Sequence, residues 1–192
     1  MKIRLLLASL LISAISFSQI SESTGKYFAK EFSKEIALYK AKDYVMKNVI
    51  GIEKKLIKFE IDPLAAASSG ELTSLVYSCS EKNLSGLVLG FYGSYWNDAG
   101  VFYQGYAFKN LPEENALEIL SKLDKYIDDE SKYLSANSDN NNLFFQYDDL
   151  TFLIYRDGSV KIRVFWNDFD SEWESTAFGR TKRRFERKIK KR

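Results

Sequence analysis

Residues 86–96 read Gly-Leu-Val-Leu-Gly-Phe-Tyr-Gly-Ser-Tyr-Trp, residues 101–109 read Val-Phe-Tyr-Gln-Gly-Tyr-Ala-Phe-Lys, and Asn-Asp-Ala-Gly separates the two runs. Both runs are rich in the β-branched and aromatic residues that favour strands. The separator consists of residues that are typical of tight turns. Strands joined by so short a connection pair antiparallel. We therefore predict an antiparallel hairpin at the centre of the fold.

The flanking regions extend this hairpin into a larger sheet. Leu56–Asp62 alternates apolar and charged residues, as a half-buried strand does, and Pro63 with the alanine- and serine-rich run after it is expected to end that strand. Asp157-Gly158 is typical of a tight hairpin turn. The remaining strands are predicted at 72–80, 143–147, 150–156 and 160–167.

Three helices are expected. Phe28, Phe32, Ile36 and Tyr39 recur at helical spacing within 26–48, and Pro112 begins a helix that reaches about residue 133. Ser171-x-x-Glu174 has the form of a capping box, so the last helix is predicted to begin there. The predicted fold class is α+β, with one antiparallel sheet of six to seven strands, helices on one face, and the order α-β-βββ-α-βββ-α.

The first eighteen residues have the pattern of a cleavable secretory signal peptide. Lys2 and Arg4 precede an uncharged run of thirteen residues, which is shorter than the about 20 residues that span a bilayer. Serines occupy the −3 and −1 positions of a cleavage before Gln19. The segment resembles the leaders of small exported proteins of Bacteroidota, which implies a bacterial chain that is periplasmic or secreted. We expect a signal peptide at 1–18, a single domain at 19–192 and no transmembrane segment in the mature chain.

The chain contains no histidine and one cysteine, Cys79. The lack of histidine excludes Ser-His-Asp and Cys-His nucleophile systems and histidine-based zinc sites. Cys79 lies in a strand-like run and is interpreted as a small buried side chain. Neither common glycine-rich phosphate-binding motif occurs. No cofactor is predicted, and any chemistry would depend on carboxylates, lysines or tyrosines.

The densest feature is the aromatic run from Phe91 to Phe108. Alternation places Phe91 on one face of its strand and Tyr92 on the other. If one face is open, it offers an aromatic surface for a sugar, a peptide or a partner protein. The alternative is that both faces are covered. The residues predicted to bind a ligand are Tyr92, Trp96, Tyr103, Tyr106 and Trp166.

Acidic residues suggest two further kinds of site. Asp98 and Asp168 each follow a Trp-Asn pair at a strand end, so they would be the catalytic pair of a two-carboxylate hydrolase if they met across a cleft. Aspartates at strand ends are also ordinary turn residues. Counting an EF-hand loop from Asp168 puts Trp173 where glycine is needed and Gly179 where glutamate is needed, so no metal site is predicted.

Positive charge is concentrated at the end of the chain. The whole chain has 28 Lys+Arg and 26 Asp+Glu, yet 180–192 holds nine basic residues and one acid, so the part before it is acidic. Such a run can contact anionic lipid or acidic glycan. The alternative is a docked helix with a solvated basic face. The residues predicted to contact an anionic surface are Arg180, Lys182, Arg183, Arg184, Arg187 and Lys188.

The leading functional interpretation is an exported, non-enzymatic binding module that uses the aromatic strands to engage an unidentified envelope or extracellular partner. One alternative is a carboxylate-dependent hydrolase of envelope or extracellular polymer. Another is an envelope-associated structural protein held by its basic C-terminal helix in peripheral contact with an anionic surface. Nucleic acid is not an expected partner, because an exported protein meets lipid and polysaccharide first.

Overall fold

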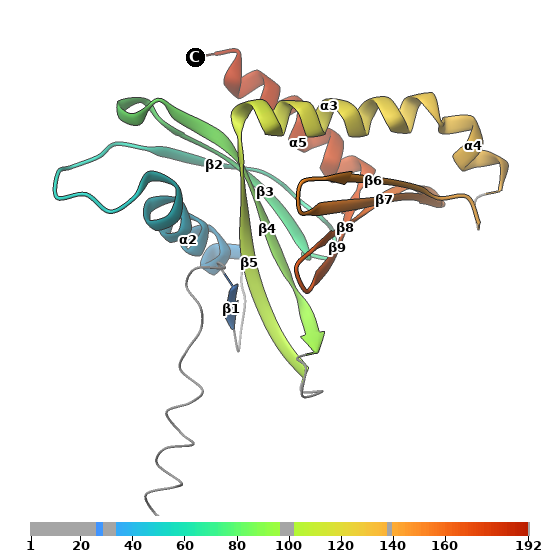
Figure 1. Cartoon of the computed structure of the whole chain (residues 1–192), viewed down its shortest axis with the longest axis horizontal. Coiled ribbons are helices and arrows are strands. Elements are labelled where there is room, and N and C mark those ends of the chain that lie inside the picture. The colour runs from blue at the N-terminus through green and yellow to red at the C-terminus, as the bar shows by residue number, and fades with distance from the viewer. Residues whose placement is uncertain (1–25, 29–33, 97–101, 138–139, 192) are drawn as a thin grey trace, which may run out of the picture.

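The structure is a computed structural model that describes residues 26–28, 34–96, 102–137 and 140–191. Its strands form two antiparallel sheets, and helices pack against them (Figure 1). The predicted α+β class is confirmed. The prediction of one sheet with six to seven strands is wrong, because the strands before and after the long central helix pair only among themselves. Residues 1–18, where the signal peptide is expected, lie outside the described residues.

The first sheet has the order β1-β5-β4-β3-β2. The central hairpin is present as predicted, with Tyr92 opposite Tyr106 and Phe91 opposite Ala107. The strands are β1 (Lys26–Phe28), β2 (Glu60–Ala66), β3 (Leu72–Cys79), β4 (Leu84–Trp96) and β5 (Phe102–Pro112). β2 is an edge strand of this sheet.

Strand β2 does not end at Pro63, as the sequence predicts, but continues to Ala66. Pro63 is tolerated because proline lacks only a donor, and an edge strand has one side on which no donor is needed. The register shifts between Pro63 and Ala65, which marks a β-bulge. The bulge lets β2 pair with β3 on both sides of the proline.

The second sheet has the order β6-β7-β8-β9, one strand more than expected. Gly158 has a φ of 67°, and β7 and β8 pair around it as the predicted Asp-Gly hairpin. The strands are β6 (Leu143–Tyr147), β7 (Leu150–Asp157), β8 (Ser159–Trp166) and β9 (Phe169–Glu174).

The capping-box prediction is wrong, because Ser171 and Glu174 belong to β9. In this strand Phe169, Ser171 and Trp173 are buried on alternate positions, and pairing with β8 satisfies the backbone groups that a cap would have served. Burial of the alternating large side chains therefore outweighs the local capping preference. The last helix begins at Ser175, directly after the end of β9 at Glu174.

The helices lie on both faces of the first sheet, so the prediction that they share one face is wrong. In Figure 1, α2 lies on one side of β3–β5, and α3, α5 and the second sheet lie on the other. The helix predicted at 26–48 is only partly present. Lys26–Phe28 form the short strand β1, and the helical part begins at Lys34. The helical elements are α2 (Lys34–Tyr44), the π-helix η2 (Val45–Ile50), the 3₁₀ turn η3 (Ser80–Lys82), α3 (Glu113–Asp129), α4 (Ser131–Ala136) and α5 (Ser175–Ile189).

The main hydrophobic core fills the space between the first sheet, α3, α5 and the second sheet. Phe91 of β4 contacts both Trp166 and Phe169, with ring centroids 5.1 and 6.1 Å apart. Phe185 anchors α5 in the same core and is fully buried. The two sheets are therefore held together by aromatic side chains from distant parts of the chain.

A second core cluster lies on the opposite face of the first sheet, beneath α2 and η2. Ala41 and Val45 are its fully buried helical members, whereas Tyr39, the one residue of the predicted apolar stripe whose side chain is described, is 70% exposed. Cys79 is buried in this cluster, as its sequence context predicts. Both faces of β3 and β4 are thus covered over most of their length.

Candidate functional site

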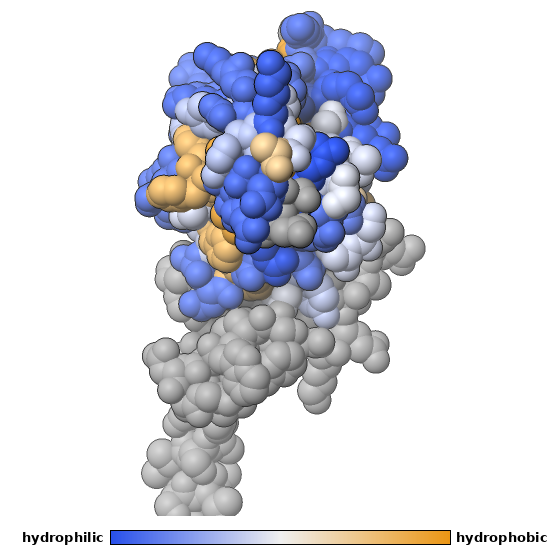
Figure 2. All heavy atoms as spheres, turned by 90° about the vertical axis from the view of Figure 1, so that its right-hand side faces the viewer, coloured by the Kyte–Doolittle hydropathy of each residue, from blue (hydrophilic) through white to orange (hydrophobic). Residues whose placement is uncertain are grey.

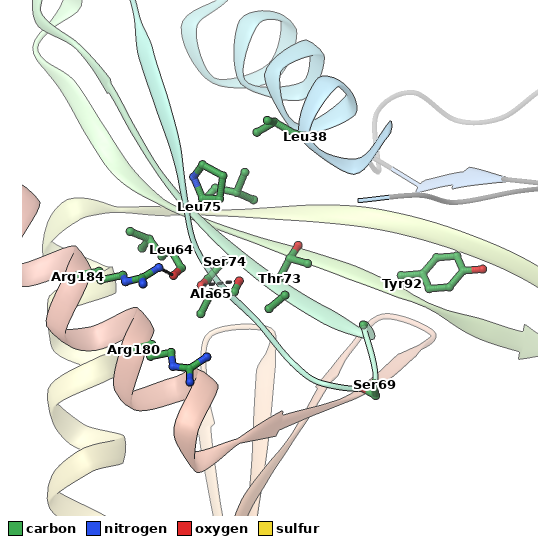
Figure 3. A pocket seen from close by; sticks show the side chains of 13 residues that line it. Leu38, Leu64, Ala65, Ser69, Thr73, Ser74, Leu75, Tyr92, Arg180 and Arg184 are labelled. Carbon is green, nitrogen blue, oxygen red and sulfur yellow. Dashed lines mark hydrogen bonds between the residues drawn. The ribbon is translucent and has the colours of Figure 1, made fainter. Parts of the chain in front are cut away.

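A pocket of about 630 Å³ lies at the β2 edge of the first sheet. It reaches around the end of the β2–β3 hairpin, from the face covered by α2 to the face covered by α5 (Figure 3). This volume is in the usual range for small-molecule sites. The residues that line it include Leu38, Leu64, Leu75, Tyr92, Arg180 and Arg184.

The position of α5 beside β3 is set by a buried pair of hydroxyl groups. The Oγ atoms of Ser74 and Thr181 lie 2.6 Å apart, and both residues are almost fully buried. Thr181 Oγ1 also lies 2.9 Å from the carbonyl oxygen of Ala177, and Ser74 Oγ lies 3.3 Å from that of Ala65, so either hydroxyl can be the donor in the shared hydrogen bond. A buried hydroxyl that lacks a partner is costly, so this chain of bonds fixes the helix against the strand.

Arg180 and Arg184 lie on either side of this anchor and reach toward β2 (Figure 3). Arg184 donates from Nη1 to the carbonyl oxygen of Leu64 at 2.5 Å, which fixes its guanidinium at the pocket wall. Arg180 is exposed and forms no hydrogen bond or ion pair with any residue that the structure describes. Because residues four apart share a helix face, the two guanidinium groups form a paired cationic rim.

The rest of the pocket wall is mainly apolar. Leu38 of α2, Leu75 of β3 and Tyr92 of β4 line it on one face of the sheet, and Leu64 lines it on the other. Thr73 also lines the wall, and its hydroxyl donates to the carbonyl oxygen of Gly90 at 3.3 Å. Ser69 and Tyr92 contribute two further hydroxyl groups to the lining.

The lining of this pocket combines guanidinium groups with apolar side chains. Its lining residues include no Asp, Glu or Cys, and its hydroxyl at Ser74 is already committed to Thr181. A guanidinium pair offers several N–H donors in a planar arrangement that matches a carboxylate or phosphate group. An anionic group at the rim with an apolar body in the interior would satisfy both parts of the wall.

The predicted aromatic residues do not share one surface. Tyr92 lines the pocket, Tyr106 is 4% exposed in the cluster beneath α2, and Trp166 is 6% exposed in the main core on the opposite face. The side chains of Trp96 and Tyr103 lie outside what the structure describes. Their role in ligand binding stays a prediction. What the structure brings together is Tyr92 of the aromatic run with Arg180 and Arg184 of the basic helix.

Trp166 instead takes part in a polar network that joins the two sheets. Its Nε1 donates to Asp149 at 2.8 Å, and Lys109 of β5 donates to the other oxygen of the same carboxylate at 2.6 Å. Burial raises the pKa of Asp149, but hydrogen bonds from Lys109 and Trp166 favour the ionised form, so that the net pKa lies below its ordinary value.

The structure does not place the predicted catalytic pair, Asp98 and Asp168, in one site. Asp98 lies outside the described residues, and Asp168 is an exposed residue in the turn between β8 and β9. Asp170 is paired with Arg163, and Glu174 accepts hydrogen bonds from the backbone and hydroxyl of Ser68. Among the described residues no group of three or more acidic or cysteine side chains is placed to hold a metal ion.

The basic residues of α5 divide into paired and unpaired groups. Lys188 is paired with Asp62 of β2, and Lys182 with Asp124 of α3, whose hydrogen bond raises the pKa of Lys182. Arg183 and Arg187 are exposed. The helix is therefore docked partly through its charges, and its contact with an anionic surface stays a prediction.

The outer face of the second sheet carries isolated apolar side chains. Phe144 and Phe165 are 75% and 37% exposed. Figure 2 views the side of the molecule that holds α4 and shows hydrophobic patches within a largely hydrophilic surface. None of the helices in the described ranges is long and apolar enough to cross a bilayer.

Sequence reasoning missed the part of the pocket that β2 and α2 supply. The pocket is lined by Pro63 and Leu64 because β2 is an edge strand, and α2 adds Leu38. The edge position of β2 cannot be predicted from a local sequence pattern. The available signal was the spacing of Arg180 and Arg184, which places two cations on one helix face. Comparisons with protein-family models, curated proteins and solved structures find nothing that matches this chain.

Proposed function

We propose that this chain is a non-enzymatic binding module that holds an amphipathic anion in the pocket between α2, β2 and α5. The observation that carries the proposal is the placement of Arg180 and Arg184 at the rim of an otherwise apolar pocket that contains no acidic side chain. The proposed ligand has a carboxylate or phosphate head and a hydrocarbon body. Export, with a periplasmic or secreted location, remains part of this proposal and rests on residues 1–18.

The energetics favour such a ligand over a purely polar or purely apolar one. Arg180 gains a charge-assisted partner that it does not have among the described residues, and charge-assisted hydrogen bonds are the stronger class. The apolar body leaves water for contacts with Leu38, Leu64 and Leu75. An extended peptide that adds a strand to β2 is less suitable, because Pro63 has no N–H and Arg184 already occupies the carbonyl oxygen of Leu64.

Isothermal titration calorimetry with dodecanoate tests the proposal. The wild-type protein is expected to bind it, and Arg180→Ala is expected to weaken the affinity about tenfold, since a hydrogen bond to a charged group contributes about 1.5–3 kcal/mol. Arg183→Ala is the matched control, because Arg183 is exposed on the same helix but does not line the pocket. Dodecanol, which has the same chain without the charge, is expected to bind more weakly.

Two results would overturn the proposal. One is an unchanged affinity of Arg180→Ala for dodecanoate, because the rim would then contribute nothing to recognition. The other is equal binding of dodecanol and dodecanoate, which would reduce the pocket to an apolar cavity. Loss of affinity in Arg183→Ala to the same extent as in Arg180→Ala would also place the anion outside this pocket.

A further inference from the structure

Four of the seven large hydrophobic side chains that are exposed in the described residues lie between positions 39 and 56. Ile52 and Leu56 are the most exposed of the seven, at 84% each. Both belong to residues 51–59, the connection from η2 to β2, which we call the 51–59 loop. Fully exposed branched aliphatic side chains lose favourable burial, so two of them on one short loop require an explanation.

The loop projects from the body of the molecule beyond the end of α2 (Figure 1). Its base is held in place, because Lys82 donates to the carbonyl oxygen of Ile50 at 2.6 Å and is paired with Glu53. At the other end, the backbone N–H of Lys58 donates to Glu81 at 3.2 Å. Ile52 and Leu56 are therefore exposed on a loop that is anchored at both ends. Ile52 also lines the rim of a pocket of about 330 Å³, together with Met46 of η2.

Packing within the loop separates its apolar side chains into two groups. Ile57 and Phe59 are half-buried against the cluster beneath α2, so they hold the loop to the first sheet. Ile52 and Leu56 take no part in either core cluster. Removing the second pair would therefore leave the fold intact, which makes the loop suitable for experiment.

The charges around the two exposed side chains are mostly positive. Lys54, Lys55 and Lys58 are exposed, and in the described part of the chain the side chains of Lys54 and Lys58 form no ion pair. Glu53, the acid of the loop, is engaged by Lys82 and by Lys55. The tip thus carries unpaired positive charge beside apolar side chains.

We propose that the 51–59 loop is an interfacial anchor that inserts Ile52 and Leu56 into the surface of an anionic lipid bilayer. Apolar side chains at the headgroup boundary, flanked by lysines that contact lipid phosphates, are the chemistry of peripheral membrane binding. The exposed lysines beside the two apolar side chains complement the negative charge of an anionic bilayer surface. Lysine stems can lie along the acyl boundary while their ammonium groups stay among the headgroups.

Co-sedimentation with lipid vesicles tests this anchor. We expect binding to vesicles of phosphatidylcholine with about 30% phosphatidylglycerol, weak binding to phosphatidylcholine alone, and release at about 0.5 M NaCl, because the charge attraction is screened. The full chain and the chain from Gln19 are both measured, because the apolar run at 5–17 would itself bind lipid. No described residue is lost in the shorter chain.

Two loop variants separate the apolar and the charged contributions. Ile52→Ser/Leu56→Ser is expected to lower the partition coefficient at least about tenfold, because each side chain buries apolar surface in the bilayer. Lys54→Gln/Lys58→Gln is expected to lower it about 25-fold, since each lysine near an anionic surface contributes about 1 kcal/mol. Phe144→Ser is the control, because Phe144 is 75% exposed on the second sheet.

A spectroscopic readout makes the test independent of vesicle pelleting. The emission of Leu56→Trp is expected to shift to the blue on addition of the anionic vesicles, as the indole enters an apolar environment. The absence of that shift, or wild-type binding by Ile52→Ser/Leu56→Ser, would overturn the anchor. So would loss of binding in Arg183→Gln/Arg187→Gln but not in the loop variants, which would assign lipid contact to α5. A soluble protein captured by the loop without vesicle binding would equally refute it.

Discussion

Ser74 of β3 and Thr181 of α5, 107 positions apart in the chain, share a buried hydrogen bond of 2.6 Å that positions the arginine-bearing helix beside the edge of the first sheet. Arg180 and Arg184 lie on either side of Thr181, so the same contact sets the rim of the pocket. A structural interaction in the core thus determines the geometry of the proposed binding site.

Substitution of either hydroxyl should destabilise the protein. Ser74→Ala and Thr181→Val are each expected to lower the free energy of unfolding by about 1–2 kcal/mol, because the buried hydrogen bond between the two hydroxyl groups is lost. Urea unfolding measures the change. Ser121→Ala, an exposed substitution on α3, is the control and should not destabilise the protein, since alanine has the higher helix propensity. Equal unfolding midpoints for Ser74→Ala and wild type would show that the contact contributes nothing.

The network of Asp149, Lys109 and Trp166 should give a pH-dependent contribution to stability. The folded pKa of Asp149 lies below its unfolded value, so the contribution is present above the unfolded pKa and is lost as the pH falls through the folded pKa. Asp149→Asn is expected to lower the free energy of unfolding by about 1 kcal/mol at neutral pH. The difference from wild type should begin to shrink near pH 4, the ordinary pKa of an unfolded Asp, and should disappear once the pH is below the lower folded pKa.

Urea unfolding of both proteins, at neutral pH and in acid, measures this difference. Asp148→Asn is the neighbouring control, because Asp148 is more exposed and lies 3.6 Å from Lys109. A gap between wild type and Asp149→Asn that stays constant with pH would contradict the assigned ionisation.

Gly90 in β4 should not accept a side chain. A Cβ atom there would lie 2.6 Å from Oγ1 of Thr73 and 3.1 Å from the ring of Phe108. Because the ring is buried in the cluster beneath α2, it has little room to move. Gly90→Ala is expected to lower the free energy of unfolding by about 1–3 kcal/mol, measured by thermal or urea unfolding. A neutral result would mean that this face of the sheet is less tightly packed than described.

Gly179 in α5 should respond in the opposite direction. Apart from its chain neighbours and the nearby backbone of its own helix, no atom lies within 4 Å of a Cβ built at this position. The residue also lies inside a helix, where glycine is unfavourable. Gly179→Ala is expected to raise the free energy of unfolding by about 0.5–1 kcal/mol, because alanine has the higher helix propensity. Thermal unfolding gives the sign of the change directly, and a lower midpoint would disprove an open environment at this residue.

Much of the secondary structure was predictable because its causes are local. The hairpin at Asp157-Gly158 follows from the turn preference of that pair, and the strands around it follow from apolar alternation. The helix α3 begins directly after Pro112, as predicted, and buries Ala116, Leu120 and Leu123 at helical spacing. In each case neighbours in the sequence are also neighbours in space.

The predictions that are wrong concern residues whose structure depends on contacts with distant segments of the chain. Ser171 and Glu174 satisfy a capping rule locally, yet pairing with β8 makes them part of a strand. The helical spacing that includes Tyr39 is present, but Ala41 and Val45 face the sheet instead. For the candidate site, Tyr92, Arg180 and Arg184 were singled out separately, and only the fold assigns them to one pocket.

By itself, the sequence determined the α+β class, the central hairpin, the basic terminal helix and the absence of histidine chemistry, because composition and short-range periodicity carry that information. The tertiary structure alone decided that there are two sheets, that helices cover both faces of the first, and that β2 is an edge strand. These features depend on which apolar faces meet. The hydrophobic effect has no preferred direction, so one pattern of apolar residues is compatible with several arrangements of strands and helices. Close packing of the whole core selects one of them.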